Sequence, residues 1–130
     1  MQEPPLQMQL HTTVLRVADL ARSRRFYETV LDMQVVYEDI HYKLITLIKP
    51  NGESSRLTLW ERREHEVPAH TGKECAYMVF FSRDAIGHRA ELQRRGGEVG
   101  PIEEYPHGLR MFWFSDPDKN QFCVIEFLPE

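Results

Sequence analysis

The sequence predicts an α+β fold made of two βαβββ modules, and two observations lead to this prediction. First, the chain of 130 residues carries an internal repeat at an offset of 65 residues, so that Asp19 corresponds to Asp84 and Glu61 to Glu126. Second, each half shows the same order of patterns: a short strand, an Asp that can cap a helix, the helix, and three strand-like runs. Two units of this length form one domain rather than a solenoid.

The first module is expected to span residues 9–62. Its opening strand, Gln9–Val17, alternates apolar and polar positions, and Asp19 is a suitable N-cap for a helix over Leu20–Leu31. Three strand-like runs follow at 33–40, 42–48 and 55–62. The last two are joined by Pro50-Asn51-Gly52, a strong hairpin signal.

A polar connector, residues 63–74, separates the first module from a second one at 75–128. The apolar run Cys75–Ser82 is typical of a buried strand, and the helix that begins after Asp84 is expected to end at Gly96-Gly97. Further strands are expected at 98–104, 109–114 and 121–128. Each helix would cover one face of a mixed, curved sheet, and the other face would surround a cavity.

Composition limits the possible partners of the protein. At 15.4 kDa, residues 1–130 fit a single domain, and a net charge of −4 argues against a nucleic-acid partner. No apolar run approaches the roughly 20 residues that cross a bilayer, so no membrane association is expected. The start, MQEPPLQMQ, lacks the pattern of a secretion signal, and Cys75 and Cys123 lie outside any CxxC pair. Reduced thiols and a cytoplasmic location are therefore expected.

Two motifs resemble one known superfamily. VADLARSRRFYETVL (residues 17–31) is similar to the first-helix pattern VxDLxxSxxFYxxxLG of vicinal oxygen chelate proteins, and FWFSDPDKNQFCVIEF (residues 112–127) to their closing strands around DPDGN. The superfamily includes glyoxalase I, extradiol dioxygenases, methylmalonyl-CoA epimerase, and the bleomycin and fosfomycin resistance proteins. The resemblance covers residues 10–128 and implies a glyoxalase/bleomycin-resistance-like fold. Asp32 and Lys119 replace glycines of the pattern, so either these turns take another shape or neighbouring groups compensate.

The resemblance also implies where a metal would be held. Metal-using members bind one divalent ion through four side chains from the first and last strands of each module. The corresponding positions here are Thr12, Thr58, Tyr77 and Cys123. Neutral hydroxyls are weak ligands, and a lone Tyr or Cys must lose a proton to bind well, so the sequence predicts no metal cofactor.

One alternative keeps a divalent ion such as Fe, Ni, Zn or Mn. It places the neighbouring residue His11, or Glu126 three residues beyond Cys123, in a shifted ligand set. A shift by an odd number of residues turns a strand side chain to the opposite face unless a β-bulge intervenes. The metal-free interpretation is therefore favoured.

Strand alternation extends the four positions into a predicted ligand-binding surface. The set is Thr12, Val14, Arg16, Arg56, Thr58, Trp60, Tyr77, Phe81, Met111, Trp113 and Cys123. Aromatic and apolar groups with a few cations are typical of a small-molecule pocket. Arg16 requires an anionic partner, which is either a ligand, as in glyoxalase-like proteins, or an internal carboxylate such as Glu38 or Asp39. Cys123 is interpreted as a buried structural thiol rather than a nucleophile.

Three functions follow from this surface. The favoured one is a metal-independent protein that binds a small, flat or apolar, anionic molecule. The second is a metal-dependent lyase, isomerase or dioxygenase with the shifted ligand set. The third is an interaction module whose pocket is closed by Trp60 packing on Trp113. By resemblance, a homodimer is expected, and the modules pair either within one chain or between two chains.

Overall fold

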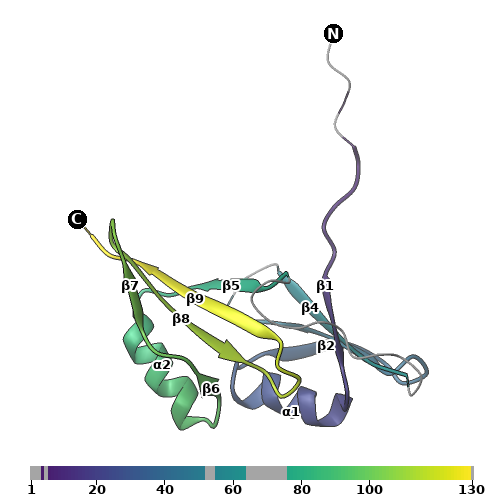
Figure 1. Ribbon diagram of the computed structural model, residues 1–130. Helices are drawn as coiled ribbons and strands as arrows, with labels where there is room; N and C mark the ends of the chain where they lie inside the picture. The colour runs from purple at the N-terminus through teal and green to yellow at the C-terminus, as the bar shows by residue number, and fades with distance from the viewer. Residues whose placement is uncertain (1–3, 5, 52–54, 64–75, 130) are drawn as a thin grey trace.

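The computed structural model describes residues 4, 6–51, 55–63 and 76–129, and these form two mixed β-sheets and two helices (Figure 1). The first module contains β1 (Thr13–Val17), α1 (Leu20–Thr29), β2 (Gln34–Asp39), β3 (Leu44–Ile48) and β4 (Arg56–Glu61). The second contains β5 (Met78–Phe81), α2 (Ala85–Arg94), β6 (Glu98–Val99), β7 (Glu103–Tyr105), β8 (Leu109–Ser115) and β9 (Gln121–Phe127). The predicted α+β class is confirmed, with one sheet for each module.

The two sheets repeat one topology. The first has the order β1-β4-β3-β2 and the second β5-β9-β8-β6, with β7 also paired to β8. In each sheet the first strand runs parallel to the last one, so that Val14 lies beside Thr58 and Val79 beside Cys123. These two pairs are related by the 65-residue offset, and the repeat seen in the sequence is therefore a repeat of strand register.

Two elements differ from the prediction. The first strand begins at Thr13 rather than Gln9. The run expected at 98–104 is split into β6 and β7, because Pro101 between them has no N–H to donate to a strand ladder. The predicted connector lies almost wholly outside the described residues, as does Cys75.

Equivalent side chains begin the two helices. Asp19 accepts a hydrogen bond from the Arg22 N–H (3.1 Å), and Asp84 accepts one from the Gly87 N–H (3.0 Å), as predicted for N-caps. Glu61 accepts from the Leu20 N–H (3.2 Å). Its counterpart Glu126 accepts from the Ala85 N–H (2.9 Å). Both glutamates thus lie at helix N-termini, where the positive end of the helix dipole favours a carboxylate.

The two residues that replace glycines do adopt left-handed backbone conformations. Asp32 has φ 55° and Lys119 has φ 67°. An ion pair accompanies each of them: Asp32 lies 2.8 Å from Arg95, and Lys119 lies 2.9 Å from Glu98. The turns therefore keep the left-handed shape of the family pattern, and each substituted residue has an ion pair beside it.

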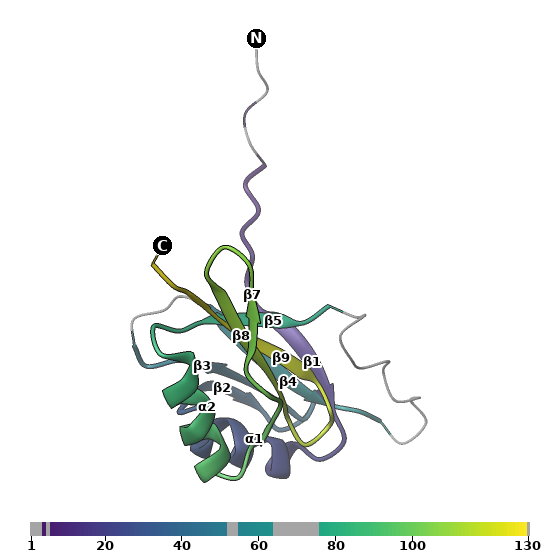
Figure 2. The same ribbon diagram turned by 60° about the vertical axis from the view of Figure 1, so that its left-hand side comes forward.

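A core common to both modules lies between the sheets and the helices. It includes Leu57 and Leu59 from β4, Tyr27 from α1, and Phe112 and Phe122 from the second sheet, all at most 2% exposed. Figures 1 and 2 show both helices on one side of the molecule, and the N-terminal segment leaving on the opposite side. The faces that carry the predicted ligand residues are turned away from this core. No helix among the described residues is long and apolar enough to span a membrane.

Candidate functional site

Arg16 and Trp60 form the best-defined part of the predicted surface. They are register partners on the neighbouring strands β1 and β4. The Arg16 guanidinium donates from Nε to the carbonyl of Trp60 (3.2 Å) and from Nη2 to the carbonyl of Glu61 (3.2 Å). Its Cζ also lies 4.8 Å from the centre of the Trp60 ring, within the range of a cation–π contact. The cation is therefore held in place by its own sheet.

The internal carboxylates considered as partners of Arg16 are engaged elsewhere. Glu38 lies 3.6 Å from Arg24, and an Asp39 oxygen accepts the Tyr42 N–H at 3.0 Å. The internal salt bridge with Glu38 or Asp39 is therefore not the arrangement adopted.

A hollow of about 590 Å³ opens beside Trp60 at the C-terminal ends of β1 and β4. Its lining residues are Ala18, His41, Tyr42, Lys43, Trp60, Glu61, Arg62 and Arg63. Three of these side chains are cationic, and ion pairs offset part of their charge, because Lys43 lies 3.5 Å from Glu61 and Arg62 lies 3.9 Å from Asp118. Sequence reasoning predicted Trp60 but missed His41, Tyr42 and Lys43, because the start of β3 comes beside Trp60 only when β3 pairs with β4, with Leu44 opposite Trp60.

The second module contributes an aromatic face. The rings of Tyr77 and Trp113 meet edge-on at 4.8 Å, and those of Phe81 and Phe127 stack at 6.4 Å. Trp113 is the register partner of Cys123, whose side chain is buried at 1% exposure. Burial at this level agrees with a structural thiol rather than a reactive one.

The remaining predicted positions lie on the same two faces. Val14 on β1 is 45% exposed, and Arg56 at the start of β4 is also exposed. Met111 on β8 is partly buried beside Ile125. The two tryptophans contact different side chains: Trp60 lies under the Arg16 guanidinium, and Trp113 meets the Tyr77 ring. The Trp60–Trp113 packing of the interaction-module hypothesis is not among the ring contacts of the described residues.

The positions implied for a metal hold a chain of hydroxyl groups instead. Thr12 Oγ1 and Thr58 Oγ1 are 2.9 Å apart, and Thr58 Oγ1 is also 2.9 Å from Thr46 Oγ1. Thr46 was not predicted, although its position opposite Thr58 in the hairpin register is the signal that could have found it. These hydroxyls satisfy one another and lack the charge that a divalent ion requires.

Neither residue of the shifted ligand set lies with these hydroxyls in the part of the chain that the structure describes. His11 is exposed and precedes β1. Glu126 faces α2, where it accepts from the Ala85 N–H and lies 3.8 Å from Arg110. Among the described residues, no three His, Cys, Asp or Glu side chains converge.

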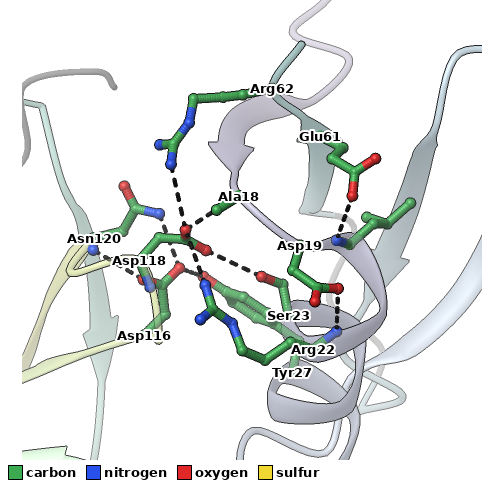
Figure 3. Close-up of polar contacts among 11 residues, drawn as sticks. Ala18, Asp19, Arg22, Ser23, Tyr27, Glu61, Arg62, Asp116, Asp118 and Asn120 are labelled. Atoms are coloured by element: carbon green, nitrogen blue, oxygen red, sulfur yellow. Dashed lines mark hydrogen bonds and ion pairs between the residues drawn. The ribbon is translucent and has the colours of Figure 1, made fainter. Parts of the chain in front are cut away.

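The two motifs that carry the family resemblance are hydrogen-bonded to each other (Figure 3). The Tyr27 hydroxyl donates to Asp116 Oδ2 at 2.6 Å, and the Ser23 hydroxyl donates to Asp118 Oδ2 at 3.1 Å. Asp118 also accepts the Ala18 N–H at 2.9 Å. Burial, followed by the nearby Asp116 charge, raises the pKa of Tyr27 well above its usual 10.0. This contact, called the clasp below, joins the first helix of one module to the closing turn of the other.

Comparison with known proteins establishes the family. The sequence model of the Glyoxalase/Bleomycin resistance protein/Dioxygenase superfamily matches residues 9–124. The chain belongs to this superfamily. No curated protein matches the chain significantly. The vicinal oxygen chelate resemblance seen in the two motifs is thereby confirmed, and the motifs that carry it are the ones that form the clasp.

Solved structures show how widely the superfamily fold is used. A superfamily member from Sphaerobacter thermophilus is 26% identical, with a TM-score of 0.75 over 92% of this chain and 97% of its own. The antibiotic-binding protein TnmS3 from a Streptomyces species is 21% identical, with a TM-score of 0.71 over 95% and 99%. The fosfomycin resistance protein FosX from Listeria monocytogenes is 16% identical, with a TM-score of 0.72 over 93% and 94%. At these identities the last two show the fold alone.

Metal-using members of the superfamily provide a test of the donor set in this chain. Thr12 and Thr58 supply only neutral hydroxyls that are hydrogen-bonded to each other, and Cys123 is buried beside Trp113. Such donors do not fit a divalent ion, which is held by carboxylate, imidazole or thiolate groups.

Proposed function

We propose that this superfamily member binds a small, flat or apolar anion at the sheet face of Arg16 and Trp60, without a metal ion. The observation that carries the proposal is the Arg16 guanidinium, fixed by two backbone carbonyls and placed 4.8 Å from the Trp60 ring. A cation that is already oriented loses little entropy when it binds an anion. The adjoining hollow of about 590 Å³ is of the size that small ligands occupy, and three of its eight lining residues are cationic.

A binding role is supported by what surrounds this face. The hydroxyl groups of Thr12, Thr58 and Thr46 form a neutral cluster where metal-using relatives would need charged ligands. TnmS3, which shares the fold, is an antibiotic-binding protein. An aromatic, anionic molecule of antibiotic size is therefore a reasonable ligand class for the protein.

We also propose that the protein acts as a homodimer in which a second copy covers the open aromatic face. Val79, Phe81 and Phe127 are 52%, 61% and 64% exposed in the single chain, which is unusual for neighbouring apolar side chains on one sheet. The segment before β1 exposes Leu6, Met8 and Leu10 at alternate positions, and it belongs to neither sheet of the described residues. In the proposed dimer, a second copy of the chain contacts both the aromatic face and the segment before β1.

The binding proposal is tested by calorimetric titration of the purified protein with 2-naphthoate, a flat aromatic carboxylate. Replacing Arg16 by Met is expected to weaken its affinity by about 10-fold or more, because a hydrogen bond to a charged group contributes about 1.5–3 kcal/mol. Arg25→Met removes the same charge from an exposed helix position and serves as the control. Equal affinities of the two variants would contradict the proposal.

Metal dependence is tested by elemental analysis of protein purified without a chelator. Fe, Ni, Zn or Mn near one equivalent, lost when His11 or Glu126 is replaced by Ala, would overturn the metal-free proposal and favour a metal-dependent lyase, isomerase or dioxygenase.

The dimer is tested by sedimentation velocity. Phe81→Glu is expected to shift the protein toward the monomer, whereas Ile86→Glu, at a 53% exposed position on α2, is expected to leave the mass unchanged. A monomeric wild-type protein would refute the proposed assembly.

A further inference from the structure

The internal repeat is broken at one of the two places where the modules meet. On one side, Tyr27 and Asp116 form the clasp. The positions related to them by the 65-residue offset are Leu92 on α2 and Asn51 after β3. Leu92 has no hydroxyl and is smaller than Tyr, so the second junction has neither the hydrogen bond of the clasp nor the volume of a buried phenol ring to fill it.

A hollow of about 380 Å³ occupies this second junction. It lies between the C-terminal end of α1, the ends of β3 and β5, and α2. The residues that the argument uses are Leu31, Lys49, Phe80, Ser82, His88 and Leu92. Its volume falls within the range of small-ligand pockets, and its walls combine apolar groups with a few polar ones, as such pockets do.

Lys49 supplies a charge that is not balanced within the described part of the chain. Its Nζ donates to the carbonyl of Leu31 at 2.7 Å, and no described carboxylate forms an ion pair with it. An ammonium group has three donors, so two of them remain for another acceptor. Arg95, which also lines the hollow, is by contrast paired with Asp32 (2.8 Å) and Glu91 (2.9 Å).

Ser82 and His88 supply a second, oriented polar group. The Ser82 side chain is buried, and its oxygen accepts the Asp84 N–H at 2.9 Å. The same hydroxyl lies 2.6 Å from His88 Nδ1 and can donate its proton there. The Ser82–His88 pair thus borders the hollow with an oriented polar group.

We propose that this junction is a second binding site, which takes a small amphiphilic carboxylate with its charge at Lys49 and its apolar body against Leu31, Phe80 and Leu92. An anion is favoured over a cation because the carboxylates at the rim, Asp32 and Glu91, are already neutralised by arginines. The site is separate from the Arg16 face, and neither proposal depends on the other.

Octanoate is a suitable probe, followed by two-dimensional NMR of the backbone amides of the full chain. Saturable shifts are expected in residues 30–31, 49, 80–82 and 88–95. Lys49→Met is expected to weaken binding at least 10-fold, while Arg25→Met and Arg16→Met leave these shifts unchanged. Octanol, which has the same tail without the charge, is expected to bind at least 10-fold more weakly.

A second variant tests the role of the broken repeat. Leu92→Tyr places at α2 the side chain that fills the equivalent space at α1, and it is expected to abolish the octanoate shifts. Should this variant fail to fold, Lys49→Met still decides the question, because Lys49 lies at the rim. Shifts confined to residues near Trp60 and Trp113, equal affinity of Lys49→Met and the wild type, or no saturable shifts at all would each overturn the second site.

Discussion

Replacing Tyr27 by Phe removes a single hydroxyl group from the clasp while keeping the ring that fills the core. The side chain is 0% exposed, and its hydroxyl donates to Asp116 Oδ2 at 2.6 Å. Asp116 is not left without partners in the variant, since Oδ2 still accepts from the Asn120 amide (2.9 Å) and Oδ1 from two backbone N–H groups. The expected loss is therefore that of one hydrogen bond to a charged acceptor, about 1.5–3 kcal/mol of unfolding free energy.

The same bond predicts a pH dependence with a definite sign. Burial and the Asp116 charge raise the pKa of Tyr27 in the folded protein well above 10.0. The stabilisation is complete below the pKa of the unfolded tyrosine, about 10, and is lost as pH rises from there through the folded pKa. Tyr27→Phe is expected to lack this alkaline loss.

Urea unfolding followed by circular dichroism at pH 7 and above pH 10 measures both effects. Tyr105→Phe is the matched control, because the Tyr105 hydroxyl also donates to a carboxylate, Glu103 at 2.7 Å, but from an exposed position. That control is expected to change the unfolding free energy by less than about 1 kcal/mol. A Tyr27→Phe variant as stable as the control would refute the view that the clasp holds the modules together.

Three further substitutions test the caps, the ion pairs and the strained turns. Glu126→Ala, which leaves the Ala85 N–H without its carboxylate, is expected to destabilise the protein by about 1 kcal/mol in thermal unfolding, and no loss would contradict the cap. Hydrogen bonds from Arg94 and then Arg95 lower the pKa of Glu91 from 4.5 to about 2, so its stabilisation is present above pH 4.5 and is lost as pH falls toward 2. Glu91→Gln should therefore reduce the acid dependence of the melting temperature over that range, and an unchanged slope would argue against it. Lys119→Gly removes about 1 kcal/mol of backbone strain at a left-handed residue, and it also removes an exposed ion pair with Glu98 that contributes less. Chemical denaturation of the variant should therefore give an equal or greater unfolding free energy. A clearly lower value would show that the ion pair outweighs the strain.

Much of the fold could be predicted because it depends on the types and spacing of residues that are close together in the sequence. The N-cap residues Asp19 and Asp84 are short acceptors placed directly before helical periodicity, and each caps its helix as expected. Strand alternation also puts Phe112 and Phe114 on one face of β8, and both are buried, at 0% and 3% exposure. Such signals lie within a few residues of one another and do not depend on the rest of the chain.

Much of the candidate site was less predictable, because its groups meet only through tertiary contacts. The carbonyls that anchor Arg16 belong to residues more than 40 positions away, and the cations around the hollow beside Trp60 come from two separate segments. The first strand was expected to begin at Gln9, but among the described residues its pairing with β4 begins only at Thr13, although the residues before it also alternate. Alternation of apolar and polar residues indicates which face of a strand is apolar. It does not indicate whether a neighbouring strand is available for pairing.

The sequence by itself determined the duplicated α+β architecture, the helix caps and the absence of charged residues from the four positions where relatives hold a metal, because each depends on residue type and local spacing. Only the tertiary structure decided what the motifs do. The docking of the modules brings Tyr27 to Asp116, 89 residues apart, and turns two family signatures into a buried contact. The same docking leaves a hollow at Leu92, because Leu is smaller than the Tyr at the equivalent position of the first module. This difference in side-chain volume matters because two packed surfaces meet there.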